Sequence, residues 1–242
     1  MAAPPRTPLQ LLFGLWAWSA GFVFILVLGT VIAATPGLER RRWLARGTAR
    51  GLLRLAALRL EVVGLEHIPP GACVVIANHA SYLDGVVLTA ALPPDFSFVI
   101  KREAARVPLL GLLLRRLRSH FVERFDRDRA RADAARLMRS AALGHPIGIF
   151  PEGTFIPEPG LRRFQRGAFV TACRAELPVV PLAIRGTREA MGGGSMCPRP
   201  GRIEVEVLPV LRPEGRSAMA VARLRDAARA AVLAACGEPD RA

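Results

Sequence analysis

A histidine and an aspartate follow an apolar segment at a spacing that suits acid–base chemistry. Residues 72–77 are continuously apolar, and His79, Ser81 and Asp84 come soon after them. His79 and Asp84 are too far apart in sequence to meet on one regular helix face. If His79 lies in a strand-to-helix turn and Asp84 in the first helical turn, the carboxylate can hold one imidazole tautomer and leave the other nitrogen as a base. The alternative is a polar turn in which Ser81 or Asp84 only caps a helix.

A second polar group follows another short apolar segment, at residues 147–150. Its members are the turn residues Glu152, Gly153 and Thr154 and the arginines Arg162, Arg163 and Arg166. A turn that contains glycine lets backbone N–H groups approach an anion, and a threonine hydroxyl adds a donor. Arginines nearby can bind phosphate, so the group is suited to phosphate capture. The alternative is an ordinary turn with a solvated basic face.

The hydrophobic pattern predicts the elements that would position both groups. Strand-like segments fall at 61–64, 72–77, 96–100, 147–150, 179–184 and 203–210, and helical segments begin near 81 and cover 109–117, 127–143, 167–175 and 217–235. Strands that alternate with helices predict an α/β fold, a sheet flanked by helices. Sites in such folds lie at the carboxyl ends of strands, where both polar groups are expected.

An apolar segment without charges, residues 9–34, opens the chain. At ~1.5 Å per residue, a helix of this length exceeds the ~30 Å bilayer core. A signal peptide is the alternative, but the segment is longer than an apolar core of ~7–15 residues and its basic cluster follows it. Because that cluster lies downstream, the positive-inside rule predicts an inner (cytoplasmic) membrane protein with its catalytic domain on the cytoplasmic side.

The next segment, residues 38–60, has the pattern of a basic amphipathic helix. Arg42, Arg46, Arg50 and Arg54 recur every four residues. Beside an apolar segment, this pattern favours a helix that lies on anionic lipid; the alternative is a basic face packed on the domain. We therefore divide the chain into a membrane anchor at 1–60 and an α/β domain at 61–242 that ends in a closing helix.

The composition favours a membrane over a nucleic acid as the anionic partner. The net charge is +14, from 34 Lys and Arg against 20 Asp and Glu, and aromatic residues make up only 6% of the chain. Nucleic-acid-binding proteins usually interleave aromatic with basic residues, so we expect no nucleic-acid partner. The four cysteines are scattered without metal-ligand spacing, so we expect no metal site. Lys101 is the only lysine, which singles out this position.

Taken together, the two polar groups resemble the signature of a known enzyme family. The run Asn-His-Ala-Ser-Tyr-Leu-Asp at 78–84, followed later by Phe-Pro-Glu-Gly-Thr at 150–154, resembles the glycerolipid acyltransferases of the 1-acylglycerol-3-phosphate acyltransferase (PlsC) type. Lys101 with the Pro and Gly after it resembles the family's second block, and 177–184 resembles its fourth. One position departs from the pattern, because Phe155 stands where the family's third block usually has an arginine that is thought to grip the acceptor phosphate.

The resemblance implies a mechanism and a role for each residue. His79 would be the base and Asp84 would orient it, while Ser81 would bond within the turn and is counted among the substrate-binding residues. The acceptor and its phosphate would be bound by Glu152, Gly153, Thr154 and Lys101, with Arg162, Arg163 or Arg166 in place of the missing arginine. The alkoxide would attack the thioester of acyl-CoA or acyl carrier protein, so neither an enzyme nucleophile nor a cofactor is needed.

The implied reaction acylates the 2-hydroxyl of 1-acylglycerol-3-phosphate and gives phosphatidate. The implied partners are membrane lipid, a lysophospholipid acceptor and the thioester donor. Because of Phe155, a second hypothesis is an acyltransferase for another lysophospholipid or for a lipid alcohol or amine. A non-catalytic membrane-anchored binding protein of the same fold is a third hypothesis, but such a protein would be expected to lose His79 or Asp84.

Overall fold

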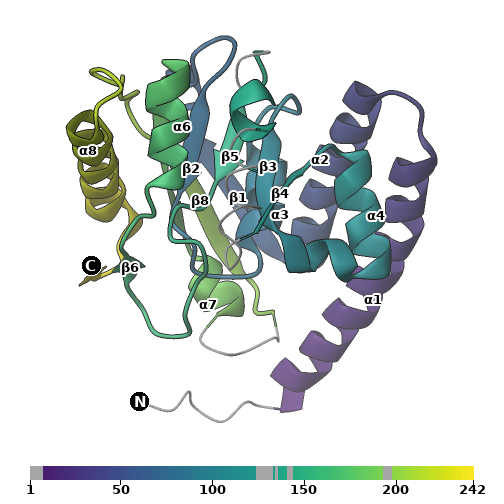
Figure 1. Cartoon of the computed structure of the whole chain (residues 1–242). Coiled ribbons are helices and arrows are strands. Elements are labelled where there is room, and N and C mark those ends of the chain that lie inside the picture. The colour runs from purple at the N-terminus through teal and green to yellow at the C-terminus, as the bar shows by residue number, and fades with distance from the viewer. Residues whose placement is uncertain (1–7, 124–132, 134–135, 141–143, 193–197) are drawn as a thin grey trace.

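The structure is a computed structural model that describes residues 8–123, 133, 136–140, 144–192 and 198–242. The helix expected at 127–143 lies largely outside these residues. The described part is built around a sheet with the strand order β1-β8-β7-β2-β5-β3-β4 (Figure 1). The strands are β1 (Leu58–Val63), β2 (Val74–Ala77), β3 (Ser97–Lys101), β4 (His120–Val122), β5 (Ile147–Ile149), β7 (Val179–Arg185) and β8 (Gly201–Val207).

The strands β2, β3, β4, β5 and β7 are parallel to one another, so their carboxyl ends meet at one edge of the sheet. β8 is antiparallel to β7, and β1 is parallel to β8. The amino end of β1 therefore lies at the same edge as the carboxyl end of β2. This edge receives both polar groups that the sequence singled out.

Helices cover both faces of the sheet, which confirms the predicted α/β fold. They are α1 (Pro8–Ala34), α2 (Leu38–Leu55), α3 (Asp84–Ala91), α4 (Pro108–Arg116), α6 (Gly167–Ala175), α7 (Thr187–Met191) and α8 (Ala218–Cys236), with short 3-10 helices η1 (Leu65–His67) and η2 (Arg102–Arg106). Val75 and Ala77 of β2 pack in the cluster with α2 and α3, whereas Val74 and Ile76 pack in the cluster with α6 and α8. Burial on both faces explains why this strand is continuously apolar.

A small second sheet joins β6 (Leu161–Arg162) to β9 (Asp240–Arg241), so the end of the chain returns to the segment after the second polar group. The sequence did not predict these two strands, because two-residue strands are too short to produce a hydrophobic period. β1 also differs from expectation, since it begins at Leu58 and crosses the boundary drawn between 60 and 61. That domain boundary stays a prediction.

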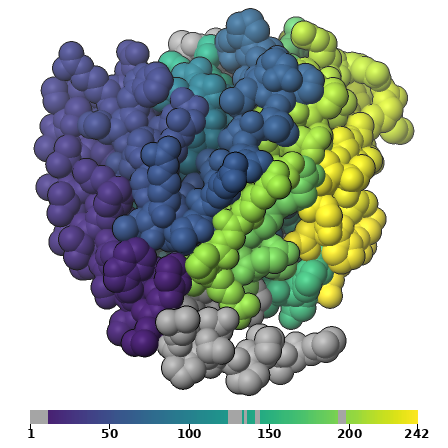
Figure 2. Space-filling view, turned by 180° about the vertical axis from the view of Figure 1, so that it is seen from behind, coloured from purple at the N-terminus to yellow at the C-terminus, as the bar shows by residue number. Residues whose placement is uncertain are grey.

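The helices α1 and α2 form an antiparallel pair, and α4 packs against α1 (Figure 1). Figure 2 shows this N-terminal part, in purple and indigo, along one flank of the molecule and α8, in yellow, along the other. Gly51 allows a close approach, because a Cβ there would lie 2.8 Å from Cζ of Phe24. Within α1, Leu12–Ala34 is long and apolar enough to cross a membrane. Its exposed large side chains are Leu12, Leu15, Trp16, Trp18, Phe22, Val23, Ile25, Leu26, Val27 and Val31.

Most of the arginine stripe on α2 binds backbone carbonyls of the protein. Arg42 Nη1 donates to the carbonyl of Asp95 at 2.6 Å, and Arg50 Nε donates to the carbonyl of Ala90 at 2.9 Å. Arg46 Nη2 donates to the carbonyl of Ala91 at 3.2 Å. The last carbonyls of a helix lack partners within it and attract cations, and here the stripe satisfies those of α3. For these three arginines the contacts match the alternative, a basic face packed on the domain, because a four-residue period does not distinguish lipid phosphate from protein carbonyls. That the helix lies on anionic lipid stays a prediction.

Candidate active site

The turn between β2 and α3 brings His79 and Asp84 into contact. His79 Nδ1 lies 2.7 Å from Oδ2 of Asp84, which is completely buried. The same oxygen accepts the backbone N–H groups of Ala80 at 2.7 Å and Ser81 at 2.8 Å. The carboxylate thus both organises the turn and fixes the imidazole, leaving Nε2 as the nitrogen that can take a proton. The geometry expected for the pair is present, and its catalytic role stays a prediction.

Two buried side chains attach this turn to β7 and α7. The Asn78 side chain donates to the carbonyl of Ile184 at 2.9 Å and accepts its N–H at 2.7 Å. Ser81 is completely buried, and its hydroxyl donates to the carbonyl of Met191 and accepts the N–H of Leu83. Ser81 therefore supports the turn, and its predicted part in substrate binding stays a prediction.

Aromatic rings surround the His79 imidazole. Phe150 stacks on it with ring centroids 4.3 Å apart, and Phe155 meets it edge-on at 4.8 Å. Tyr82 packs edge-on against Phe155 at 4.7 Å, and the His79 side chain remains 17% exposed. These rings limit the access of water to the base while leaving it within reach of a ligand. The sequence placed Phe150 and Phe155 beside the second polar group but did not predict that their rings would contact His79.

Glu152 joins the two polar groups through the backbone. It is 4% exposed, and its two carboxylate oxygens accept the N–H of His79 at 2.7 Å and the N–H of Arg162 at 2.9 Å. Burial raises the pKa of Glu152, and the two backbone hydrogen bonds oppose that rise. Glu152 was expected to bind the acceptor, but both its oxygens hold the site together instead. Gly153 supplies the turn beside it, with a φ of 80° that favours glycine.

Two cations meet at Thr154. Lys101 Nζ, at the end of β3, lies 3.1 Å from the Thr154 hydroxyl, and Arg162 Nη1 donates to the Thr154 carbonyl at 3.2 Å. The Lys101 side chain is exposed, so a ligand can reach it. The structure thus brings together the only lysine and the first of the three candidate arginines. A hydroxyl between two cations is a suitable place for a phosphate group.

The other two candidate arginines lie toward α8. Arg166 Nη2 donates to the carbonyl of Ala218, at the start of that helix, at 3.5 Å. Arg163 is exposed and interacts electrostatically with Asp226 of α8. The sequence did not indicate this division, because all three arginines follow the same turn.

Within the ranges that the structure describes, no three His, Cys, Asp or Glu side chains gather as metal ligands. The groups that the site does offer are a positioned imidazole, a buried carboxylate behind it, and two cations beside a hydroxyl. They suit removal of a proton from a hydroxyl on a ligand that carries a phosphate.

Comparison with known proteins assigns the class. The sequence pattern of the acyltransferase family matches residues 59–185. Over 224 residues, the chain is 31% identical to the 1-acyl-sn-glycerol-3-phosphate acyltransferase of Pseudomonas aeruginosa, which covers 90% of this chain and 86% of that protein. The chain belongs to the acyltransferase family, and the resemblance seen in its motifs is confirmed.

Two further comparisons, one of sequence and one of structure, show what the chain shares with other acyltransferases. The chain is 29% identical over 233 residues to lysophosphatidylcholine acyltransferase 1 of Danio rerio, spanning 85% of this chain but 43% of that relative. The fold matches the crystal structure of PlsC, the 1-acyl-sn-glycerophosphate (LPA) acyltransferase of Thermotoga maritima. The TM-score is 0.77 at 20% identity, over 96% of this chain and 98% of the other. The names of these proteins thus share the acyl-transfer class and differ in the acceptor.

Proposed function

We propose that this protein transfers a fatty acyl chain from a thioester to the 2-hydroxyl of 1-acylglycerol-3-phosphate and so forms phosphatidate. The observation that carries the proposal is the His79 imidazole, held at Nδ1 by the buried carboxylate of Asp84 at 2.7 Å. The curated relative from Pseudomonas aeruginosa, whose name specifies this acceptor, supports the choice of substrate.

In the proposed reaction, His79 Nε2 removes the proton of the acceptor hydroxyl while that oxygen attacks the thioester carbonyl. The Asp84 carboxylate stabilises the imidazolium that forms. The tetrahedral intermediate carries its negative charge on the former carbonyl oxygen. Its collapse forms the ester, breaks the carbon–sulfur bond and releases a thiolate, which takes the proton back from His79. Because a thiolate leaves readily, the mechanism uses no enzyme nucleophile and no cofactor.

The proposed acceptor phosphate is bound by Lys101 and Arg162 beside Thr154. Phe155 stands at the position of the family's arginine but does not bind the phosphate, since its ring contacts His79 and Tyr82. Lys101 and Arg162 converge on Thr154 from different segments and could supply the charge that position 155 lacks. The donor in this proposal is acyl-CoA or acyl carrier protein, which present the same thioester.

We propose that the protein lies on the cytoplasmic side of the inner membrane, with its active-site edge toward the lipid. α1 contacts α2 at Gly21 and Leu52, and the first turns of α1 extend past the end of α2 (Figure 1). This part of α1 carries the exposed apolar residues Leu12, Leu15 and Trp16. α2 ends beside the start of β1, which lies at the edge of the sheet that holds His79. A lipid acceptor held by this membrane surface would therefore have a short path to the base.

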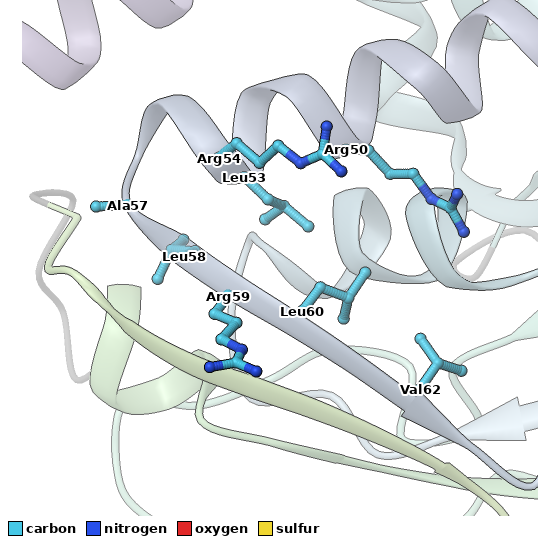
Figure 3. A pocket seen from close by; sticks show the side chains of 8 residues that line it. All are labelled: Arg50, Leu53, Arg54, Ala57, Leu58, Arg59, Leu60 and Val62. Carbon is cyan, nitrogen blue, oxygen red and sulfur yellow. The ribbon is translucent and has the colours of Figure 1, made fainter.

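A groove between α2 and β1 supports this orientation. Its volume is about 490 Å³, and it is lined by Arg50, Leu53, Arg54, Ala57, Leu58, Arg59, Leu60 and Val62. Figure 3 shows Arg50 and Arg54 reaching out from α2 beside Leu53 and Leu60. Guanidinium groups beside apolar side chains suit the level of lipid headgroups. Arg50, whose Nε also binds the carbonyl of Ala90, and Arg54 are thus the members of the stripe proposed to lie at the headgroups.

The test is acyl transfer by the detergent-purified protein with one labelled acyl-CoA and a panel of acceptors. The panel contains lysophosphatidate, lysophosphatidylcholine, lysophosphatidylethanolamine and glycerol-3-phosphate. The proposal predicts the highest kcat/KM with lysophosphatidate. A preference for lysophosphatidylcholine would instead support the second candidate, which Phe155 and the Danio rerio relative favour. If no acceptor reacts with acyl-CoA, the panel is repeated with acyl carrier protein, and failure with both donors contradicts acyl transfer.

A further inference from the structure

We infer that the end of the chain completes the acceptor site, with Arg188 and Glu238 as positioning residues for the loop that carries Thr154 and Phe155. The loop, called here the acceptor loop, comprises residues 154–160. The C-terminal tail comprises residues 237–241. This inference rests on the proposed function, because it concerns how the lysophospholipid acceptor is bound.

The tail holds the far end of the acceptor loop through the backbone. The Glu238 carboxylate accepts the N–H of Gly160 at 2.5 Å, and the carbonyl of Pro239 accepts the N–H of Leu161 at 2.8 Å. Close packing accompanies these bonds, because a Cβ on Gly160 would lie 2.5 Å from Cγ of Arg241. The tail and the loop therefore fit together only with glycine at position 160.

Arg188 holds the middle of the same loop. Its Nε lies 2.6 Å from the Glu238 carboxylate, and its Nη1 donates to the carbonyls of Ile156 and Pro157, both at 3.0 Å. The two charged side chains are only 11% and 13% exposed, so water screens their interaction little. A single guanidinium thus binds the loop directly and also binds the carboxylate that anchors its end.

The helix that carries Arg188 also supports the catalytic turn. Its last residue, Met191, accepts the hydroxyl hydrogen of Ser81, which belongs to the turn of His79. α7 therefore contacts both the turn that carries the base and the acceptor loop, and it fixes one relative to the other. Within the loop, the orientation of Thr154 toward Lys101 and of Phe155 toward His79 depends on this support.

The alternative is that these contacts only stabilise the fold. Arg229 shows what such a role looks like, since it donates to the carbonyl of Leu161 at 2.8 Å and pairs with Asp240 without contacting the acceptor loop. Arg188 differs, because its partners Ile156 and Pro157 directly follow Phe155. Its loss should therefore change acceptor binding more than overall stability.

The experiment uses the full-length protein and two variants, Glu238→Gln and Arg188→Lys. The first removes one of two carboxylate acceptors, and the second keeps the charge but loses the planar fork. We expect KM for the acceptor to rise about tenfold in each, the effect of losing a hydrogen bond to a charged group. We expect kcat and the KM for the acyl donor to stay within about twofold of wild type, because the base is untouched.

The matched control is Arg216→Gln, which breaks an exposed ion pair with Glu176 away from the loop. Its acceptor KM should equal that of wild type, since exposed pairs contribute little. Unchanged acceptor KM in both test variants would overturn the inference. So would an equal rise in the control.

Hydrogen exchange provides a readout that does not depend on activity. In Glu238→Gln, amides at 154–162 should exchange about tenfold faster while those of β7 keep the wild-type rate, because local opening leaves the core closed. Equal acceleration in β7 would assign these contacts to global stability and overturn the inference, as would an unchanged loop. If wild type transfers no acyl chain to any acceptor, the proposed function fails, and the exchange result still decides whether the tail holds the loop.

Discussion

The turn that carries the base and the loop that faces the acceptor are held in different ways. Within residues 78–84, Asp84 binds the backbone of Ala80 and Ser81 and the ring of His79, all close neighbours in the sequence. The acceptor side depends on Lys101 from β3 and on Arg188 and Glu238, which lie 50 residues apart. The His79 ring is thus oriented by a sequence neighbour, although Asn78 and Ser81 attach its turn to β7 and α7. The acceptor loop takes its position from distant segments.

This difference implies that the two regions respond differently to substitution. Changes in the turn should lower kcat, because they alter the group that moves the proton. Changes around the acceptor loop should raise the acceptor KM, because they alter where the substrate is held. Each of the following predictions tests that separation between effects on kcat and effects on the acceptor KM.

The largest effect is expected for Asp84→Asn. The amide cannot stabilise an imidazolium, and its NH₂ group would face the backbone N–H groups that the carboxylate now accepts. We expect kcat to fall about 10²–10⁴-fold, the range for general acid–base catalysis. The measurement is steady-state acyl transfer with thermal unfolding alongside it. A folded variant that keeps most of its kcat would show that the imidazole needs no carboxylate.

The next largest effect is expected for Glu152→Ala, because Glu152 joins the two regions. It leaves the N–H groups of His79 and Arg162 without their acceptor, and an unsatisfied buried group costs about 1–3 kcal/mol. We expect lower stability together with a decrease in kcat and an increase in acceptor KM, measured by denaturant unfolding and kinetics. A change in only one kinetic constant would contradict the bridging role of Glu152.

The contribution of Glu152 to folding stability should change with pH in a definite direction. Because burial raises the pKa of Glu152, the folded protein binds this proton more tightly than the unfolded chain, whose value is near 4.5. The contribution of Glu152 to stability is therefore greatest below pH 4.5 and decreases as the pH rises through the raised pKa. The difference in unfolding free energy between wild type and Glu152→Ala should therefore decrease as the pH rises across this range. A difference that increases with pH would contradict the burial effect.

A smaller effect is expected for Lys101→Met on the acceptor side. Losing one charged donor to a phosphate should raise the KM for lysophosphatidate by about ten- to a hundredfold, with kcat nearly unchanged. Lys101→Arg keeps the charge and should restore part of the affinity. Kinetics with lysophosphatidate and with an uncharged monoacylglycerol separate a loss of phosphate binding from a general loss of acceptor binding. An equal change for both acceptors would exclude Lys101 as a phosphate ligand.

The sequence predicted the α/β fold and the His79–Asp84 contact, since both depend on local pattern. β2 is apolar throughout because both its faces are buried, and the turn after it contains its own hydrogen-bond partners. The reversed direction of β1 was not predictable, because hydrophobic period does not encode which way a strand runs. The partners of the arginines were not predictable either, since Arg46 binds a carbonyl at the end of α3 and Arg166 binds one at the start of α8. Such assignments depend on which distant segment packs beside each residue.

Arg188 and Glu238 were missed for the same reason. Neither belongs to a recognisable motif, and their contact exists only because β9 pairs with β6. In the same way, Glu152 was assigned to the acceptor because its motif gave its neighbours but not the direction of its carboxylate. The sequence thus identified which residues gather at the site better than it identified what each one touches.

The most direct test of the central claim is acyl transfer by His79→Ala in lipid vesicles. The variant is compared with wild type using lysophosphatidate and a labelled acyl thioester, with vesicle binding and thermal unfolding measured on the same samples. The account predicts that turnover falls to background while binding and folding remain at wild-type levels. A folded, vesicle-bound variant that retains substantial turnover would contradict the assignment of His79 as the base.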